Sequence, residues 1–228
     1  MTDDDVMIVG AGVLGSSIAC ALARAEPELR IVLSGRRGPG ASQAAGAMLG
    51  VLGEVTAAGA GTRHGELRLG MAVEAAARWP SWREAVRESA GAAAPDDGFG
   101  AGTYILLNAV SGPADEAALE AIGAAGSRYG LPVEEATASD IPSYRPLDND
   151  RALRALLLPQ ERFLDARQWL RTLEAALRAL PNASQARQAA TVRRSFGGRA
   201  SSTRRREMYR RGAGSHSWHN LSAATENP

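Results

Sequence analysis

The order of apolar and polar positions predicts a strand, a turn, a helix and a second strand near the N-terminus. Residues 6–9 form a short, continuous apolar run, which is typical of a parallel strand covered on both faces. A glycine-rich turn at 10–15 opens a helical stretch that continues to about Arg24, and Pro27 breaks it. Residues 30–33 then predict a second strand. This order is that of a βαβ unit, whose crossover is expected to be right-handed.

Further along, the chain alternates between predicted helices and apolar runs. Small residues predict a loop from 38 to about 61, and residues 66–86 predict a long amphipathic helix that Pro80 kinks or divides. The apolar face of this helix is expected to carry Leu67, Met71, Ala75, Trp79 and Trp82. Beyond it we expect a turn at 95–98, a strand at 103–107, a helix at 116–129, an apolar run at 155–158 and a helix at 166–180 capped by Asp165.

After about Asn182 this patterning stops. Residues 187–228 hold 9 arginines against two acidic residues, and they show no sustained helical or strand period. Residues 1–186, by contrast, hold 17 arginines against 23 acidic residues. The C-terminal segment is therefore predicted to be a basic, unstructured tail.

The overall composition is that of an ordinary globular protein, with 228 residues of which 45% are hydrophobic. A single cysteine, Cys20, and three histidines argue against a disulfide scaffold and against a metal site. The uncharged run at 6–23 follows three aspartates instead of a basic segment, and its glycines and serines make a poor membrane span. We therefore expect a cytoplasmic protein with no membrane partner.

The turn after the first strand carries the glycine spacing of a dinucleotide-binding fingerprint. Gly10 would permit the sharp turn, Gly12 would let the backbone contact a pyrophosphate, and Gly15 would let the helix pack close to the strand. The helix N-terminus would then offer free N–H groups to the phosphates. The predicted cofactor-binding residues of this turn are Gly10, Ala11, Gly12, Val13, Leu14 and Gly15. The alternative is a tight strand-to-helix turn of an alanine-rich α/β protein.

One element of the fingerprint is missing. An acidic residue normally ends the second strand and binds the ribose of the cofactor, and Gly35 stands in that place. Ser34 could make one weaker hydrogen bond to the ribose. Arg36 or Arg37 could instead bind a 2′-phosphate, which favours NADP, or both could be solvated surface residues.

The next segment, Gly40-Ala41-Ser42-Gln43-Ala44-Ala45-Gly46-Ala47-Met48-Leu49, resembles the second flavin-contacting loop of the D-amino-acid oxidase and glycine oxidase family. That resemblance implies FAD as the cofactor, with Ser42 donating to a phosphate or the ribitol. It also implies backbone N–H groups near the flavin ring from Ala44 to Gly46. The predicted cofactor-binding residues here are Ala41, Ser42, Gln43, Ala44, Ala45, Gly46 and Met48.

Weaker matches extend the resemblance to about residues 5–180. The segment 102–107 is similar to the first strand of the family's substrate domain, and 158–167 resembles the return to the flavin domain. The implied fold is α/β: a partial Rossmann-like FAD-binding domain at 1–96 and 159–186, and the beginning of an α+β substrate domain at 97–158. The basic tail at 187–228 completes the expected organisation.

The implied activity is oxidation of the C–N bond of a small amino acid or amine. Hydride would pass to the flavin, the resulting imine would be hydrolysed, and oxygen would reoxidise the flavin and release peroxide. No motif assigns a catalytic side chain. The alternatives are an NAD(P)-dependent oxidoreductase built on the same βαβ unit, or a non-catalytic remnant whose basic tail binds a partner. We do not expect that partner to be a nucleic acid, because no nucleic-acid-binding fold accompanies the arginines.

The resemblance also implies that about half of the family pattern is missing after the last predicted helix. Arginine, serine and glycine with scattered tryptophan would result from a high-GC gene read in a shifted frame, which places the expected shift near 183–192. With only two strands of the flavin-domain sheet, the first strand would keep an unpaired edge. We therefore expect the chain alone to be unstable or to bind flavin poorly.

Overall fold

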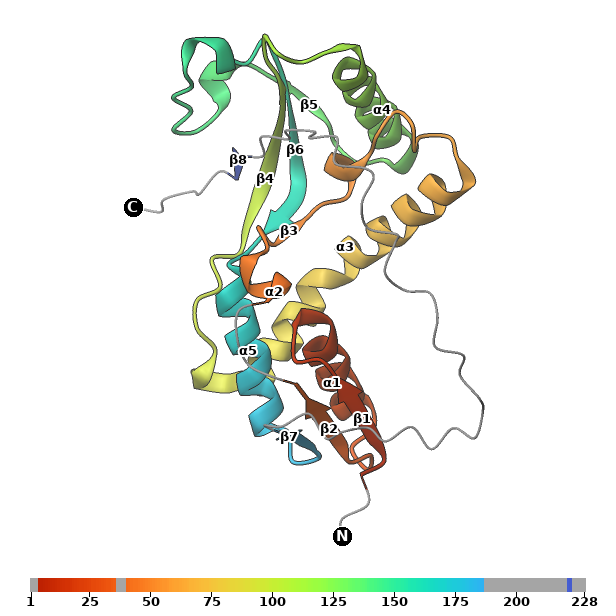
Figure 1. Cartoon of the computed structure of the whole chain (residues 1–228), viewed down its shortest axis with the longest axis vertical. Helices are drawn as coiled ribbons and strands as arrows, with labels where there is room; N and C mark the ends of the chain where they lie inside the picture. The colour runs from red at the N-terminus through yellow and green to blue at the C-terminus, as the bar shows by residue number, and fades with distance from the viewer. Residues whose placement is uncertain (1–3, 36–39, 187–220, 223–228) are drawn as a thin grey trace, which may run out of the picture.

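The structure, a computed structural model, describes residues 4–35, 40–186 and 221–222. It contains two sheets, one parallel and one antiparallel, which Figure 1 shows at opposite ends of the long axis. The parallel sheet has the order β1-β2-β7 and consists of β1 (Val6–Val9), β2 (Ile31–Ser34) and β7 (Ala183–Ala186). The antiparallel sheet has the order β3-β6-β4-β8, and β5 also pairs with β6. Its strands are β3 (Met48–Leu49), β4 (Gly100–Leu107), β5 (Glu134–Ala136), β6 (Arg154–Phe163) and β8 (Leu221–Ser222).

In the described residues, five α-helices lie around these sheets. They are α1 (Val13–Ala25), α2 (Ala41–Ala44), α3 (Arg63–Ala90), α4 (Pro113–Tyr129) and α5 (Ala166–Ala179). The described residues also form four short 3₁₀ helices. They are η1 (Leu52–Glu54) between β3 and α3, η2 (Gly91–Ala93) between α3 and β4, and η3 (Ala138–Asp140) and η4 (Asp148–Asp150) between β5 and β6. Within the described part of the chain, no helix combines the length and apolar character that crossing a bilayer requires.

The predicted βαβ unit is confirmed, and its sheet is larger than expected. Strands β1 and β2 pair in parallel, and β7 adds a third parallel strand on the far side of β2. The expectation of only two strands, with patterning lost after Asn182, was therefore wrong. The signal was weak because β7 reads Ala-Ser-Gln-Ala, which has no apolar run, and its strand form depends on pairing with β2. Among the described residues, β1 pairs with β2 alone, and Val9 on it is 69% exposed.

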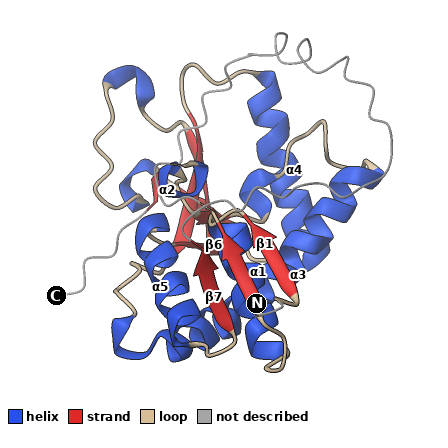
Figure 2. Cartoon of the chain, turned by 60° about the horizontal axis from the view of Figure 1, so that its bottom comes forward, coloured by secondary structure: helices blue, strands red, loops and turns tan. Residues whose placement is uncertain are grey.

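The core of this region lies on one face of the parallel sheet, where α1, α3 and α5 pack together (Figure 2). Ile31 and Leu33 of β2 meet the fully buried Trp169 and Leu173 of α5. Asp165 caps α5 as predicted, because its Oδ1 accepts hydrogen bonds from the N–H groups of the second and third residues after it, at 2.8 and 2.9 Å. Trp169 stacks at a tilt on Trp79 of α3, with ring centroids 5.4 Å apart.

Cys20 of α1 is also buried in this core. Burial raises the pKa of its thiol to about 12, with a smaller opposing effect from the Arg24 charge. The Sγ donates to the carbonyl oxygen of Leu173, at 3.6 Å. This cysteine is therefore a packing residue held as the thiol, and it carries no nucleophilic chemistry.

Helix α3 differs from its prediction in length, continuity and buried face. It runs unbroken past Pro80, so the proline does not divide it. The predicted apolar stripe was wrong at two positions, because Leu67 is 59% and Met71 is 73% exposed. The first half of the helix instead packs through Leu69 against the cluster on the antiparallel sheet. In the second half, Trp79, Trp82 and Val86 pack in the core of the parallel sheet. The helix thus spans the distance between the two sheets (Figure 1), which the spacing of its apolar residues could not indicate.

One other prediction needs correction. The segment 38–61, expected as a loop, contains α2, β3 and η1 in its described part. Within the predicted tail, Leu221 and Ser222 form β8 and pair with β4. The remaining tail residues lie outside the described residues. Strand β6 runs across residue 158, where we expected the substrate-domain portion to end, and pairs with β3. The division into domains remains a prediction.

Two glycines of α4 make a matched pair for testing the packing. A methyl group at Gly126 would lie 2.4 Å from Cγ2 of Val133, so Gly126→Ala is expected to destabilise the fold by about 1–3 kcal/mol. Gly123 has no atom within 4 Å of such a methyl, so Gly123→Ala is expected to stabilise it by about 0.5–1 kcal/mol. Denaturant unfolding of both variants measures the difference, and effects of the same sign would contradict this packing.

Candidate functional site

The glycine turn has the backbone that the fingerprint requires. Gly10 has φ +115°, a conformation that residues with side chains rarely adopt. A Cβ atom at Gly15 would lie 1.9 Å from the carbonyl oxygen of Gly10, so α1 can pack this close to β1 only with glycine there. Gly12 caps α1 with extended backbone, and the first turn of the helix carries no acidic residue. The N-terminus of α1 is therefore suited to an anion.

Ser42 connects the two motifs, which lie about thirty residues apart in sequence. Its Oγ accepts a hydrogen bond from the backbone N–H of Val13, at 3.1 Å. A Cβ atom at Gly12 would lie 2.9 Å from the same oxygen. The glycine turn and the 40–48 segment therefore form one continuous surface at the carboxyl end of β1. The Ser42 hydroxyl proton stays available to an acceptor in the cleft, because Oγ accepts from Val13 and does not donate to it.

The missing acidic residue has a steric explanation. A Cβ atom at Gly35 would lie 2.6 Å from the backbone nitrogen of Ala11, so the chain packs glycine directly against the glycine turn. The carbonyl oxygen of Ser34, which precedes it, accepts from the N–H of Gly10 at 2.7 Å. The end of β2 thus supports the turn through its backbone.

A cleft of about 730 Å³ lies beside these groups, within the range of roughly 300–1,000 Å³ that small-molecule sites occupy. Of the predicted residues, it is lined by Ala11, Gly12, Ala41, Ser42 and Gln43. Its opposite wall is one face of α5 together with β7, which sequence reasoning missed. The lining residues there are Arg167, Leu170, Arg171, Glu174, Leu177 and Gln185.

The arginines of α5 contribute positive charge to this cleft. Arg167 and Arg171 are one helical turn apart, and both side chains are exposed at its edge. The Nε of Arg167 donates to the carbonyl oxygen of Gln43 at 3.4 Å, which ties α5 to the flavin-loop segment. The spacing of the two arginines on the polar face of α5 was the available signal, but only the folded chain shows that this face meets the glycine turn.

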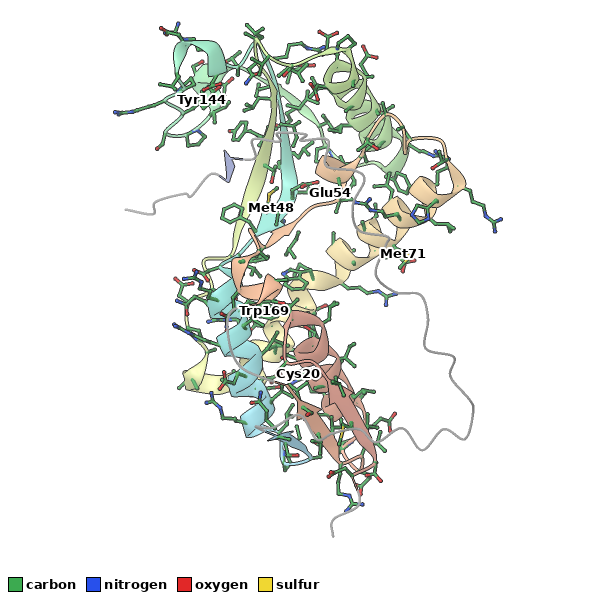
Figure 3. All side chains as sticks on the ribbon, in the orientation of Figure 1. Cys20, Met48, Glu54, Met71, Tyr144 and Trp169 are labelled. Atoms are coloured by element: carbon green, nitrogen blue, oxygen red, sulfur yellow. The ribbon has the colours of Figure 1, made fainter. Side chains whose placement is uncertain are left out.

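The other predicted site residues that the structure describes are not among the residues lining the cleft. Leu14 is 77% exposed on α1, and Ser34 is buried beneath the glycine turn. Ala44, Ala45 and Gly46 follow the cleft wall in sequence, and Figure 3 shows Met48 beside the antiparallel sheet, to which its strand β3 belongs. Arg36 and Arg37 lie outside the described residues.

A second hollow, of about 270 Å³, lies between α3 and α4, away from the glycine turn. Its charged rim is already paired, because Arg68 meets Glu54 at 3.3 Å and Arg128 meets Glu66 at 2.7 Å. Of the predicted cofactor-binding residues that the structure describes, none lines it. The cleft beside the glycine turn is the better candidate because both motifs converge on it.

The family comparison agrees with this geometry. Residues 5–209 match the family model described as FAD dependent oxidoreductase. The chain belongs to this family. The match to these FAD-dependent oxidoreductases continues past residue 180, where the resemblance was expected to end, and past the expected frame shift near 183–192. A comparison with curated protein sequences gives no match.

Several solved structures are similar to this chain in fold. A glycine oxidase from Geobacillus kaustophilus superposes with a TM-score of 0.62 and 26% identity, covering 80% of this chain and 46% of its own. An iminodiacetate oxidase from Chelativorans gives 0.56 and 22%, with coverages of 79% and 46%. An L-α-glycerophosphate oxidase from Mycoplasma pneumoniae, solved with FAD bound, gives 0.55 and 16%, with coverages of 82% and 45%. The chain spans about half the length of these relatives.

The residues present fit the family's cofactor. FAD needs a close backbone approach for its diphosphate, and a side chain at Gly12 would crowd the cleft beside the Ser42 Oγ. It also needs hydrogen-bond donors and positive charge, which the α1 N-terminus and the exposed Arg167 and Arg171 supply; the one acidic residue in the lining, Glu174, is paired with Arg178. The residues of the cleft therefore fit FAD, the cofactor of this family.

Proposed function

We propose that the chain binds FAD in this cleft and that the protein oxidises the C–N bond of a small amino acid or amine. The observation that carries the proposal is the Val13–Ser42 hydrogen bond, because it joins the two flavin-loop motifs in one cradle. The likeness to a glycine oxidase at 26% identity supports an amino-acid substrate. Bound flavin would supply the two-electron oxidation of the substrate carbon.

The chain's own residues would bind and orient the cofactor. The N–H groups at the start of α1 and the Ser42 hydroxyl would hold the diphosphate by charge-assisted hydrogen bonds. Arg167 and Arg171 would neutralise its charge from the α5 side. The segment 44–48 leads from this end of the cofactor towards β3, and its small residues would let the backbone approach the flavin ring.

Anaerobic reduction tests this proposal. The purified chain is loaded with FAD, and the absorbance band at about 450 nm is followed after adding glycine, small amines, glycolate or NADPH. We expect glycine or another small amine to bleach the band. Glycolate is the matched control, because it has the size of glycine and a hydroxyl in place of the amine. Bleaching by glycolate or NADPH alone, with none by amines, would contradict the proposal.

A further inference from the structure

Glu161 is a buried acid that neither motif accounts for. It lies on β6 and is only 3% exposed. The β4–β6 pairing is irregular there, since Ala101 pairs with Arg162 while Thr103 pairs with Leu158. Three residues of β6, including Glu161, thus lie opposite Gly102, which has φ +94°. Such a bulge redirects side chains, and here it places a carboxylate inside the protein.

The Glu161 carboxylate holds the chain that follows β3 close to β6, where the backbone pairing of these two strands has ended. Met48 and Leu49 pair with β6 through their backbones, and the chain then leaves the sheet. Oε1 of Glu161 accepts hydrogen bonds from the N–H groups of Val51 and Gly53, both at 2.8 Å. One side chain therefore fixes the turn that directly follows the predicted flavin loop.

The other oxygen, Oε2, is buried and has no hydrogen-bond partner in the described part of the chain. The turn leaves room for this oxygen because residue 53 is glycine. A Cβ atom there would lie 3.2 Å from Oε2, which is closer than Cβ contacts usually are. Such an arrangement, with one oxygen left without a partner, costs free energy, so it needs a reason beyond packing.

The backbone just before β3 is strained. Ala47 has φ +48°, which is uncommon for a residue with a side chain. Strain of this kind persists where surrounding contacts fix the chain, and it gathers at ligand-binding segments. Ala47 lies between the cradle residues 42–46 and the turn that Glu161 holds, and its carbonyl oxygen accepts from Leu164 N–H at 3.3 Å.

We propose that Glu161 is a positioning residue for the flavin. Its carboxylate holds the 50–54 turn, and the turn fixes the 44–48 segment in the conformation that receives the cofactor. The inference rests on the proposed function, because the segment has this role only if FAD binds in the cleft. Glu161 itself acts through the backbone of Val51 and Gly53.

Four variants test this role. Glu161→Ala removes the acceptor, whereas Glu161→Gln keeps an amide oxygen that can accept from both N–H groups. Gly53→Ala places a methyl group 3.2 Å from Oε2 and displaces the carboxylate without changing its charge. Gln160→Ala, at an exposed position on the same strand, is the matched control. FAD dissociation constants, the visible circular dichroism of bound flavin and amide exchange at Val51 and Gly53 are measured for each.

We expect Glu161→Ala and Gly53→Ala to weaken FAD binding by about tenfold and to change the visible circular dichroism of the flavin. Glu161→Gln should restore the affinity to within about threefold of the unaltered chain, and Gln160→Ala should match it. Faster exchange at Val51 and Gly53 with unchanged affinity and spectrum would mean a purely structural role and overturn the inference. If Glu161→Ala fails to fold, the FAD affinities of Gly53→Ala and Glu161→Gln test the inference in its place. If the unaltered chain binds no FAD, the proposed function fails as well.

Discussion

Replacing Gly15 with valine is expected to abolish measurable FAD binding and to destabilise the fold. The Cβ atom would lie 1.9 Å from the carbonyl oxygen of Gly10 and 3.0 Å from its carbon, which are backbone atoms that no rotamer change can move. Helix α1 must therefore shift away from β1, and its N-terminal N–H groups leave the cleft. Overpacking of this kind costs about 1–3 kcal/mol of unfolding free energy. Denaturant unfolding and FAD titration measure the two effects.

Ala21→Val is the matched control for this prediction. It adds the same kind of β-branched side chain to α1 at an exposed position. Its unfolding free energy should change by no more than about 0.5 kcal/mol, and its FAD affinity should not change. If Gly15→Val bound FAD as tightly as the control, the assigned role of the glycine turn would be wrong.

Replacing Asp97 with alanine is expected to be the most destabilising change at a charged residue. The Asp97 side chain is fully buried, and Arg83 binds both of its oxygens, at 2.9 Å from Nε and 2.6 Å from Nη2. A second arginine, Arg87, approaches the Asp97 carboxylate at 3.6 Å. The backbone carbonyl oxygen of Asp97 accepts a hydrogen bond from the N–H of Asp165 at the start of α5. Removing one partner of a buried pair leaves the others uncompensated and costs about 3–5 kcal/mol.

Glu88→Ala supplies the comparison on the same helix as the two arginines. Glu88 is 77% exposed and meets Arg24 at 3.9 Å, so its loss should cost no more than about 1 kcal/mol. Thermal or denaturant unfolding of both variants measures the difference. Similar unfolding free energies for Asp97→Ala and Glu88→Ala would contradict the role of Asp97 as the anchor between α3 and α5.

Local sequence signals predicted the parts of the fold that depend on neighbouring residues. The run at 6–9, the glycine turn and the Asp165 cap each determine structure within a few residues, and all three form the expected elements. The expectation that the first strand is covered on both faces was wrong, because Met7 is 44% and Val9 is 69% exposed. Strand β7 escaped prediction because its sequence is neutral and its partner, β2, lies about 150 residues earlier. The exposed Leu67 and Met71 show the same limit, since spacing cannot tell which face of α3 meets the core.

The candidate site could be predicted only in part for the same reason. The glycine spacing and the small residues of 40–48 are visible in the sequence, and the structure brings both to the carboxyl end of β1. Arg167 and Arg171 enter the cleft because α5 packs beside α2, which no local pattern indicates. The bulge that turns Glu161 inward likewise depends on the pairing of β4 with β6. The sequence showed glycine at position 35, where an acidic ribose ligand was expected. The close contact with the Ala11 backbone explains why glycine stands there.

Mapping backbone amide shifts during an FAD titration tests the cradle most directly. The measurement uses the isotope-labelled chain and follows each assigned N–H as FAD is added. We predict saturable shifts that are largest at residues 10–15 and 41–48, with Val13 and Ser42 among the most affected. Shifts that cluster in the hollow between α3 and α4, or no shifts at saturating FAD, would contradict the assignment.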